Sequence, residues 1–213
     1  MSSGHLRAEH GGGLARALVD PPDPAVAAAG PPPRPALAPP WSLTAVRPTG
    51  SEVELVQRWM SAPHVAEFWR QAWPLADWST EVARQLGDDH SRPWLVSLDG
   101  RPVAYLEVYR VARDVIAAHH EVGPRDLGVH IAIGDPARTG RGLGPRLLAA
   151  VADALLAAEP GCRSVLGDPD TAHTVARRAF AAAGFEPVAD VDLPHKRATL
   201  MARGRPPAVR GTP

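Results

Sequence analysis

The sequence has a single cysteine, Cys162, no long apolar run and no net charge. One cysteine excludes an internal disulfide and is typical of a reducing compartment, so we expect a cytoplasmic protein. No run approaches the roughly 20 apolar residues that a membrane-spanning helix needs, and the first residues lack the apolar stretch of a secretory signal. The 23 basic and 23 acidic side chains balance, which argues against a nucleic-acid-binding surface.

Proline, in contrast, is abundant, with 24 residues, and it gathers with glycine and alanine in residues 1–40. Such a segment has too few large apolar side chains to offset the entropy lost on ordering, so residues 1–40 are predicted to be a disordered leader. Residues 41–203 are predicted to form one domain, and residues 204–213 a flexible tail. This length is sufficient for one full hydrophobic core.

The order of the predicted elements indicates an α+β fold. Apolar periodicity predicts helices at 51–60, 74–87, 142–158 and 171–183 and strands at 42–47, 94–98, 102–109, 127–133, 164–167, 185–191 and 196–202. Ser51 is predicted to cap the first helix, and Asp99-Gly100 to form a hairpin turn. The strand–helix–strand unit in the middle predicts a mixed sheet that contains a parallel pair of strands.

A glycine-rich turn follows the strand at 127–133. Gly140, Gly142 and Gly144 come just before an amphipathic helix. Glycines leave room for a ligand, and the amides at the helix N-terminus favour a phosphate group. Taken alone, the pattern also fits a tight strand-to-helix turn without a ligand. A Rossmann dinucleotide site is disfavoured, because the motif comes late and a hairpin precedes it.

Two ionisable residues lie beside this turn in the predicted topology. Period-two alternation places His130 on one face of its strand between the small residues Gly128 and Ala132. A histidine suits proton removal from an amine, although a buried structural histidine is the alternative. Asp168 ends the next strand and can attract an ammonium, accept its proton or orient His130; the alternative is a turn or capping aspartate.

These motifs resemble the GCN5-related N-acetyltransferase (GNAT) superfamily. Its signature Arg/Gln-x-x-Gly-x-Gly/Ala is matched by Gly142 and Gly144, with Thr139 in the first position. Its signature Asn-x-x-Ala-x-x-x-Tyr-x-x-x-Gly-Phe is matched with His173 in place of Asn and Phe180 in place of Tyr. The resemblance implies a GNAT fold, with a splayed parallel strand pair flanked by helices, and coenzyme A bound over the glycine turn. Phe180 has no hydroxyl and cannot protonate a departing thiolate.

A longer set of matches resembles the siderophore-biosynthesis branch of this superfamily. The matching residues are His64-Val65, Trp69, Trp73-Pro74, Trp78, Tyr105 to Tyr109, Asp114, Asp126 to His130, and Asp168-Pro169-Asp170. Enzymes of this branch acylate the side-chain amine of lysine, hydroxylysine or hydroxyornithine in mycobactin-like siderophores. The resemblance implies acyl-CoA or an acyl carrier protein as donor, a lysine-like precursor as acceptor, and His130 with Asp168 as the catalytic pair.

The candidate site residues follow from the motifs and the resemblance. The donor is expected at Gly140, Arg141, Gly142, Leu143, Gly144, Ile131, Ile133 and His173, and the acceptor at His130, His64, Trp73 and Asp114. No metal is expected, because His119, His120 and Glu121 lack a closed ligand set. A monomer is expected. The alternatives are an aminoglycoside N-acetyltransferase and a non-catalytic thioester-binding module.

Overall fold

The computed structural model describes residues 23–205, so the expectations for residues 1–22 and 206–213 lie outside it. Helices of the described part are α1 (Pro24–Ala27), α2 (Ser51–Met60), α3 (Pro63–Trp69), α4 (Leu75–Gly87), α5 (Leu143–Ala158) and α6 (Thr174–Ala182). Its strands are β1 (Trp41–Ala45), β2 (Ser91–Leu98), β3 (Arg101–Arg110), β4 (Leu127–Ile133), β5 (Ser164–Gly167), β6 (Glu186–Leu193) and β7 (Lys196–Gly204). Three 3-10 turns are η1 (Val111–Arg113), η2 (Val115–Ala118) and η3 (Pro136–Arg138).

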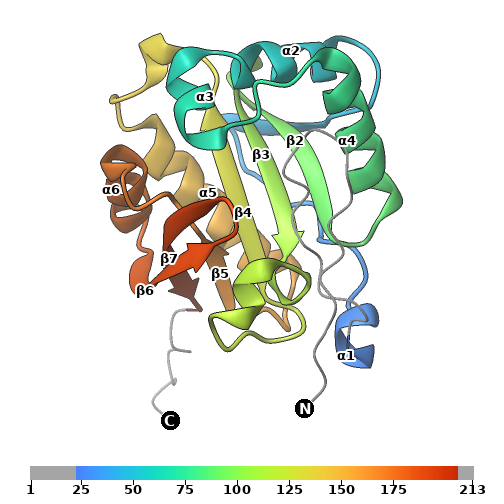
Figure 1. Ribbon diagram of the computed structural model, residues 1–213, viewed down its shortest axis with the longest axis vertical. Helices are drawn as coiled ribbons and strands as arrows, with labels where there is room; N and C mark the ends of the chain where they lie inside the picture. The colour runs from blue at the N-terminus through green and yellow to red at the C-terminus, as the bar shows by residue number, and fades with distance from the viewer. Residues whose placement is uncertain (1–22, 206–213) are drawn as a thin grey trace.

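The strands form one mixed sheet in the order β1-β2-β3-β4-β5-β7-β6 (Figure 1). β4 and β5 run parallel, and the other neighbours pair antiparallel, which confirms the predicted α+β fold. The parallel pairing is short, because only Leu127↔Val165 and Gly128↔Leu166 are in register. Beyond these residues β4 stays paired with β3 but has no β5 partner. The two strands therefore part and leave an open edge of β4 in the middle of the sheet.

Helices cover both faces of this sheet, with α5 behind it and α3 and α4 in front in Figure 1. On the α5 face, Leu147, Leu155 and Phe180 pack against the strand residues Leu106 and Val129. The hydrophobic pattern of α5 supplies this stripe at helical spacing. Among the described residues, no helix is both long and apolar enough to cross a membrane.

The opposite face carries two further apolar clusters. Tyr105 and Ala132 pack with α2, α3 and α4, whereas Tyr109 packs with η1, η2 and the β6–β7 hairpin. Glu107 and His130 are opposite each other across β3 and β4, between those two positions. Because strand side chains alternate, these five strand positions point to the same face of the sheet. A polar pair therefore lies between two apolar clusters.

Part of the segment predicted to be a leader contacts the domain, at residues 29–31. Arg110 is buried, and its guanidinium donates hydrogen bonds to the carbonyls of Ala29, Gly30 and Pro31. The same guanidinium pairs with Glu159 at 3.0 Å. Composition had favoured disorder, but a buried cation with several acceptors compensates for the missing apolar contacts.

The first residues of two helices and one hairpin turn can also be compared with the predictions. Gly50 is the N-cap of α2, so the predicted capping role of Ser51 is wrong; Ser51 is the first helical residue and makes no such bond. Pro63 begins α3, at a position where a proline needs no amide hydrogen. Asp99-Gly100 forms the predicted turn, with positive φ at both residues.

Candidate active site

A cavity of about 690 Å³ opens where β4 and β5 part. Its wall includes His130 of β4, Asp168 just after β5, and the glycine turn before α5. Residues that are distant in the sequence thus meet at one site, since the broken pairing leaves space that side chains of both strands can enter. The sequence prediction placed His130 and Asp168 on adjacent strands, and the structure brings them together.

His130 and Asp168 are in direct contact. The imidazole Nε2 lies 2.5 Å from Asp168 Oδ1, a distance typical of a strong, charge-assisted hydrogen bond. Asp168 is 5% exposed and accepts a longer bond of 3.4 Å from the Tyr109 hydroxyl. The carboxylate therefore fixes the orientation of the imidazole while both groups still line the cavity.

The other edge of the imidazole faces Glu107. His130 Nδ1 is buried and lies 3.9 Å from Glu107 Oε2, and Glu107 is 4% exposed. An imidazolium formed during a proton transfer would lie between two carboxylates. Since Nδ1 is closed off from the cavity, Nε2 and Asp168 are the groups that can exchange a proton with a ligand there.

Tyr109 holds the ring of His130 from one side. The two rings are stacked, with centroids 4.5 Å apart and an interplanar angle of 9°. Trp69 of α3 approaches the imidazole edge-on, with its centroid at 6.1 Å. Gly128 makes the stack feasible, because an added Cβ would lie 2.1 Å from Tyr109 Cζ.

Lys196, the first residue of β7, reaches the same carboxylate. Its Nζ lies 3.0 Å from Asp168 Oδ2 and donates to the Asp168 carbonyl at 2.5 Å. Sequence analysis did not select Lys196, Glu107 or Tyr109 as site residues. Glu107 could have been identified from the sequence, because it is a charged residue inside an otherwise apolar strand.

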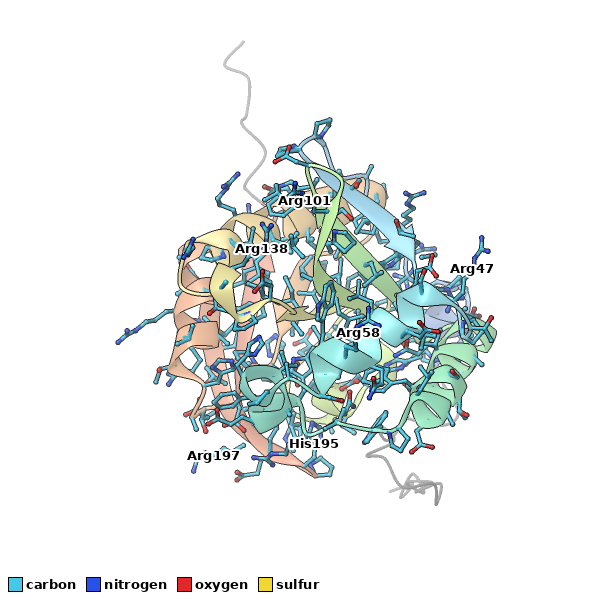
Figure 2. All side chains as sticks on the ribbon, turned by 90° about the horizontal axis from the view of Figure 1, so that it is seen from above. Arg47, Arg58, Arg101, Arg138, His195 and Arg197 are labelled. Carbon is cyan, nitrogen blue, oxygen red and sulfur yellow. The ribbon has the colours of Figure 1, made fainter. Side chains whose placement is uncertain are left out.

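Helix α3 closes the cavity opposite the sheet. His64 Nε2 is hydrogen bonded with the Ile133 carbonyl at 3.0 Å, and Phe68 stacks on His173 at 3.8 Å and 10°. Burial lowers the pKa of His173, which favours the neutral ring in this stack. Arg70 donates to the His195 carbonyl at 2.6 Å, and Figure 2 shows His195 at the hairpin edge beside α3. His64 and His173, both predicted, line the cavity.

The glycine turn forms the far end of the cavity. Gly140 and Gly142 have φ values of 68° and 74°, in the left-handed region where glycine is unstrained. Gly142 is the N-cap of α5, and no side chain caps the first amides of that helix. Gly144 lines the cavity as well. The turn thus exposes backbone donors and a helix N-terminus, which together favour a negatively charged group.

Other predicted site residues divide into those that line the cavity and those that do not. Ile131 and Ile133 line it. Leu143, the first residue of α5, is buried in the core, and Arg141 is exposed outside the cavity wall. Trp73 packs against Trp78 with ring centroids 5.3 Å apart, away from the lining.

Asp114 also lies outside the cavity wall. It is buried, caps η2 through the Ile116 amide and lies 3.5 Å from His90 Nε2. In residues 23–205, no group of three or more His, Cys, Asp or Glu residues is arranged to hold a metal ion.

Comparisons with known proteins find relatives that match most of the chain. The family model described as "Acetyltransferase (GNAT) domain" matches residues 49–193. The lysine N-acyltransferase MbtK of Mycolicibacterium paratuberculosis is 39% identical over 193 residues, which cover 91% of this chain and 86% of that protein. The N(6)-hydroxylysine O-acetyltransferase of Escherichia coli is 32% identical over 155 residues, which cover 73% of this chain and 49% of that protein.

A solved structure has the same fold. The crystal structure of the aminoglycoside acetyltransferase AAC(6')-Ib in complex with coenzyme A superposes with a TM-score of 0.70 and 23% identity. The match covers 78% of this chain and 95% of that one.

Proposed function

This chain belongs to the GNAT acetyltransferase family, and we propose that it transfers an acyl group from a thioester to the side-chain amine of lysine or a lysine-like siderophore precursor. The proposal depends above all on the 2.5 Å contact between His130 and Asp168 inside the cavity that also reaches the glycine turn. One cavity thus offers a group that can take a proton from an amine and a cradle for a donor phosphate. A non-catalytic thioester-binding module would have no use for the first of these.

Coenzyme A is the proposed form of the donor. Its pyrophosphate would accept hydrogen bonds from the amides around Gly142 and Gly144, at the uncapped N-terminus of α5. Thr139 also lines the cavity there and can add a hydroxyl donor. Ile131 and Ile133 on β4, with His173 on the opposite wall, would enclose the chain that leads to the thioester. An acyl carrier protein would present the same phosphopantetheine thioester at this mouth and is the alternative donor.

The amine must lose a proton before it attacks. A free lysine amine has a pKa near 10.4, so deprotonation at pH 7 costs roughly 4–5 kcal/mol. Asp168 would first attract the ammonium, and the Asp168–His130 pair would then accept its proton. The neutral nitrogen attacks the thioester carbonyl, whose oxyanion is stabilised by an amide on the unpaired edge of β4. Phe180 cannot act as an acid, so the pair returns the proton to the departing thiolate.

The acceptor is proposed to be lysine itself rather than an aminoglycoside. Two relatives whose names specify lysine or N(6)-hydroxylysine are 39% and 32% identical, whereas the aminoglycoside N(6')-acetyltransferase of Klebsiella pneumoniae is 26% identical. The acidic residues that line the cavity are Glu67, Asp168 and Asp170, and Asp168 is the one in contact with His130.

A matrix of donors and acceptors tests the proposal. Acetyl-CoA and a long-chain acyl-CoA are each combined with lysine, N(6)-hydroxylysine and kanamycin, and thiol release and product mass are measured. We expect acyl-lysine to form fastest. Faster acylation of kanamycin would support the aminoglycoside alternative, and donor binding without thiol release to any amine would support the non-catalytic one.

Cellular location and assembly state complete the proposal. We propose that the protein is cytoplasmic, because its single cysteine cannot form an internal disulfide, and that it is a monomer. Burial raises the pKa of Cys162 to about 11, so this thiol is poorly reactive. Size-exclusion chromatography with light scattering tests the monomer.

A further inference from the structure

Lys196 is the single lysine in the whole chain. The sequence has 23 lysine and arginine residues in total, and all of the others are arginines. This one lysine lines the cavity, whereas the next residue, Arg197, points outward from the hairpin in Figure 2 with a side chain that is 65% exposed. Because arginine stands at all the other positions of this kind, the lysine at position 196 indicates that the cavity requires an ε-amine.

The ε-amine of Lys196 occupies the position that the mechanism assigns to the acceptor. Its Nζ lies 3.0 Å from Asp168 Oδ2, and the other oxygen of the same carboxylate contacts His130 Nε2. A second bond to the Asp168 carbonyl holds the ammonium there, and the side chain is 13% exposed. The lysine is thus already in contact with the group that would deprotonate a substrate amine.

A counter-ion alone would not require lysine. A guanidinium pairs with a carboxylate through two parallel bonds and stays charged at all accessible pH values. A lysine differs in one property that matters here, because it can lose its proton and become a nucleophile. It is also the functional group on which the proposed reaction acts.

We propose that Lys196 is an internal acceptor, which the protein acylates on Nζ when a thioester donor is bound and no free amine is present. This inference rests on the proposed function. The Asp168–His130 pair takes one proton from the ammonium, and the neutral nitrogen attacks the thioester carbonyl. The N–C bond forms, the C–S bond breaks, and the thiolate leaves as the thiol with the proton from the pair. As the amide forms, the nitrogen loses its second proton to the same pair, which has already given the first to the thiolate, and the pair then releases this proton to solvent.

Acylation would change the cavity in two ways. The amide nitrogen carries no charge, so the ion pair between Lys196 and Asp168 is lost. The acyl group also adds volume beside the catalytic pair, where a free amine must bind. The acylated form is therefore a self-inhibited state, and a free acceptor protects against it by competing for Asp168.

Mass spectrometry of the full-length protein tests the inference. The protein is incubated with acetyl-CoA alone, and both the intact mass and the peptide that carries Lys196 are followed over time. We expect up to one acetyl group on Lys196, slower labelling when free lysine is added, and a fall in turnover in proportion to the labelled fraction. His130→Ala should label on the order of 100-fold more slowly.

Two controls separate an enzymatic reaction from chemical acetylation. Lys196→Arg retains the positive charge beside Asp168 but removes the acceptor, so labelling of this peptide should disappear. The unfolded chain at the same acetyl-CoA concentration measures the uncatalysed rate. Labelling of Lys196 at equal rates in the native, His130→Ala and unfolded proteins would overturn the inference.

The same samples distinguish this inference from the proposed function. Acylation of free lysine without any label on Lys196 overturns the inference and leaves the function standing. A label on Lys196 without acylation of any free amine supports the inference and contradicts the proposed acceptor. If Lys196 is not labelled and no thiol is released, both the inference and the proposed function are overturned.

Discussion

The rings of Tyr109 and His130 lie parallel, with centroids 4.5 Å apart and planes 9° from each other. This stack and the hydrogen bond to Asp168 together fix the orientation of the imidazole ring. Tyr109 and Gly128 are opposite each other in the β3–β4 register, so the tyrosine ring lies over a position without a side chain. The geometry of the proposed catalytic histidine therefore depends on a glycine two residues earlier in the same strand.

Gly128→Ala is expected to lower kcat/KM by about 100-fold, a loss typical of a catalytic group displaced by about 1 Å. The new Cβ would lie 2.1 Å from Tyr109 Cζ, so the ring must move and release His130. Thiol release measures the rate, and near-ultraviolet circular dichroism shows that the fold persists. Gly87→Ala is the control, because nothing lies within 4 Å of a Cβ there. Equal rates in both variants would contradict a positioning role for the stack.

His130→Ala and Asp168→Ala are each expected to reduce turnover by about 10²–10⁴-fold while donor affinity is retained. The double variant should be little worse than either single one, because the two residues act as one unit. Thiol release gives turnover, and isothermal titration with coenzyme A gives affinity. Asp192→Ala, on an exposed part of β6, should behave like the parent protein. Unchanged turnover in both single variants would rule out the proton pathway.

Glu159→Gln is expected to lower the free energy of unfolding by about 3 kcal/mol at pH 7, because it leaves the buried Arg110 charge without its carboxylate. Burial acts to raise the pKa of Glu159, but the hydrogen bonds from Arg110 and Arg125 outweigh it and keep the pKa below its usual value. The stabilisation is thus present above the unfolded pKa of about 4.3 and is lost as the pH falls through the folded value.

Urea unfolding at pH 7 and pH 3.5 measures this effect. The difference between the parent protein and Glu159→Gln should shrink at the lower pH. Glu54→Gln on the exposed side of α2 should change stability by less than about 0.5 kcal/mol. A gap between the parent and Glu159→Gln that stays constant with pH would contradict the role of the carboxylate charge.

His173→Phe is expected to make the melting temperature less sensitive to acid. Burial lowers the pKa of His173, so the unfolded chain binds a proton more readily than the folded one. The neutral ring therefore stabilises the fold above about pH 6.5, and this contribution falls as the pH drops below that value. Phenylalanine retains a ring to stack on Phe68.

Melting curves between pH 7.5 and pH 5 test this prediction. The fall in melting temperature across that range should be smaller in His173→Phe than in the parent protein. His119→Phe provides the control, because His119 is exposed in the loop before β4. An identical fall in His173→Phe and the parent would show that protonation of His173 is not coupled to unfolding.

The regular elements were predictable because their signals are local. The strand at 127–133, the hairpin around Asp99-Gly100 and the helix after the glycine turn all appear where periodicity and turn residues indicate them. The contact made by residues 29–31 was not predictable, since its partner Arg110 is far away in the chain. Composition describes what a segment can bury by itself and contains no information about such a partner.

For the site, the chain's own motifs were sufficient to select His130, Asp168 and the glycine turn, because His130 lies within a predicted strand, the turn follows that strand, and Asp168 ends the next one. The tertiary structure decided the surroundings of that pair. Glu107 and Tyr109 come from the antiparallel neighbour β3, and Lys196 arrives from the β6–β7 hairpin. Contacts between strands depend on register and on the point where β4 and β5 part, and neither is encoded in a local pattern of residues.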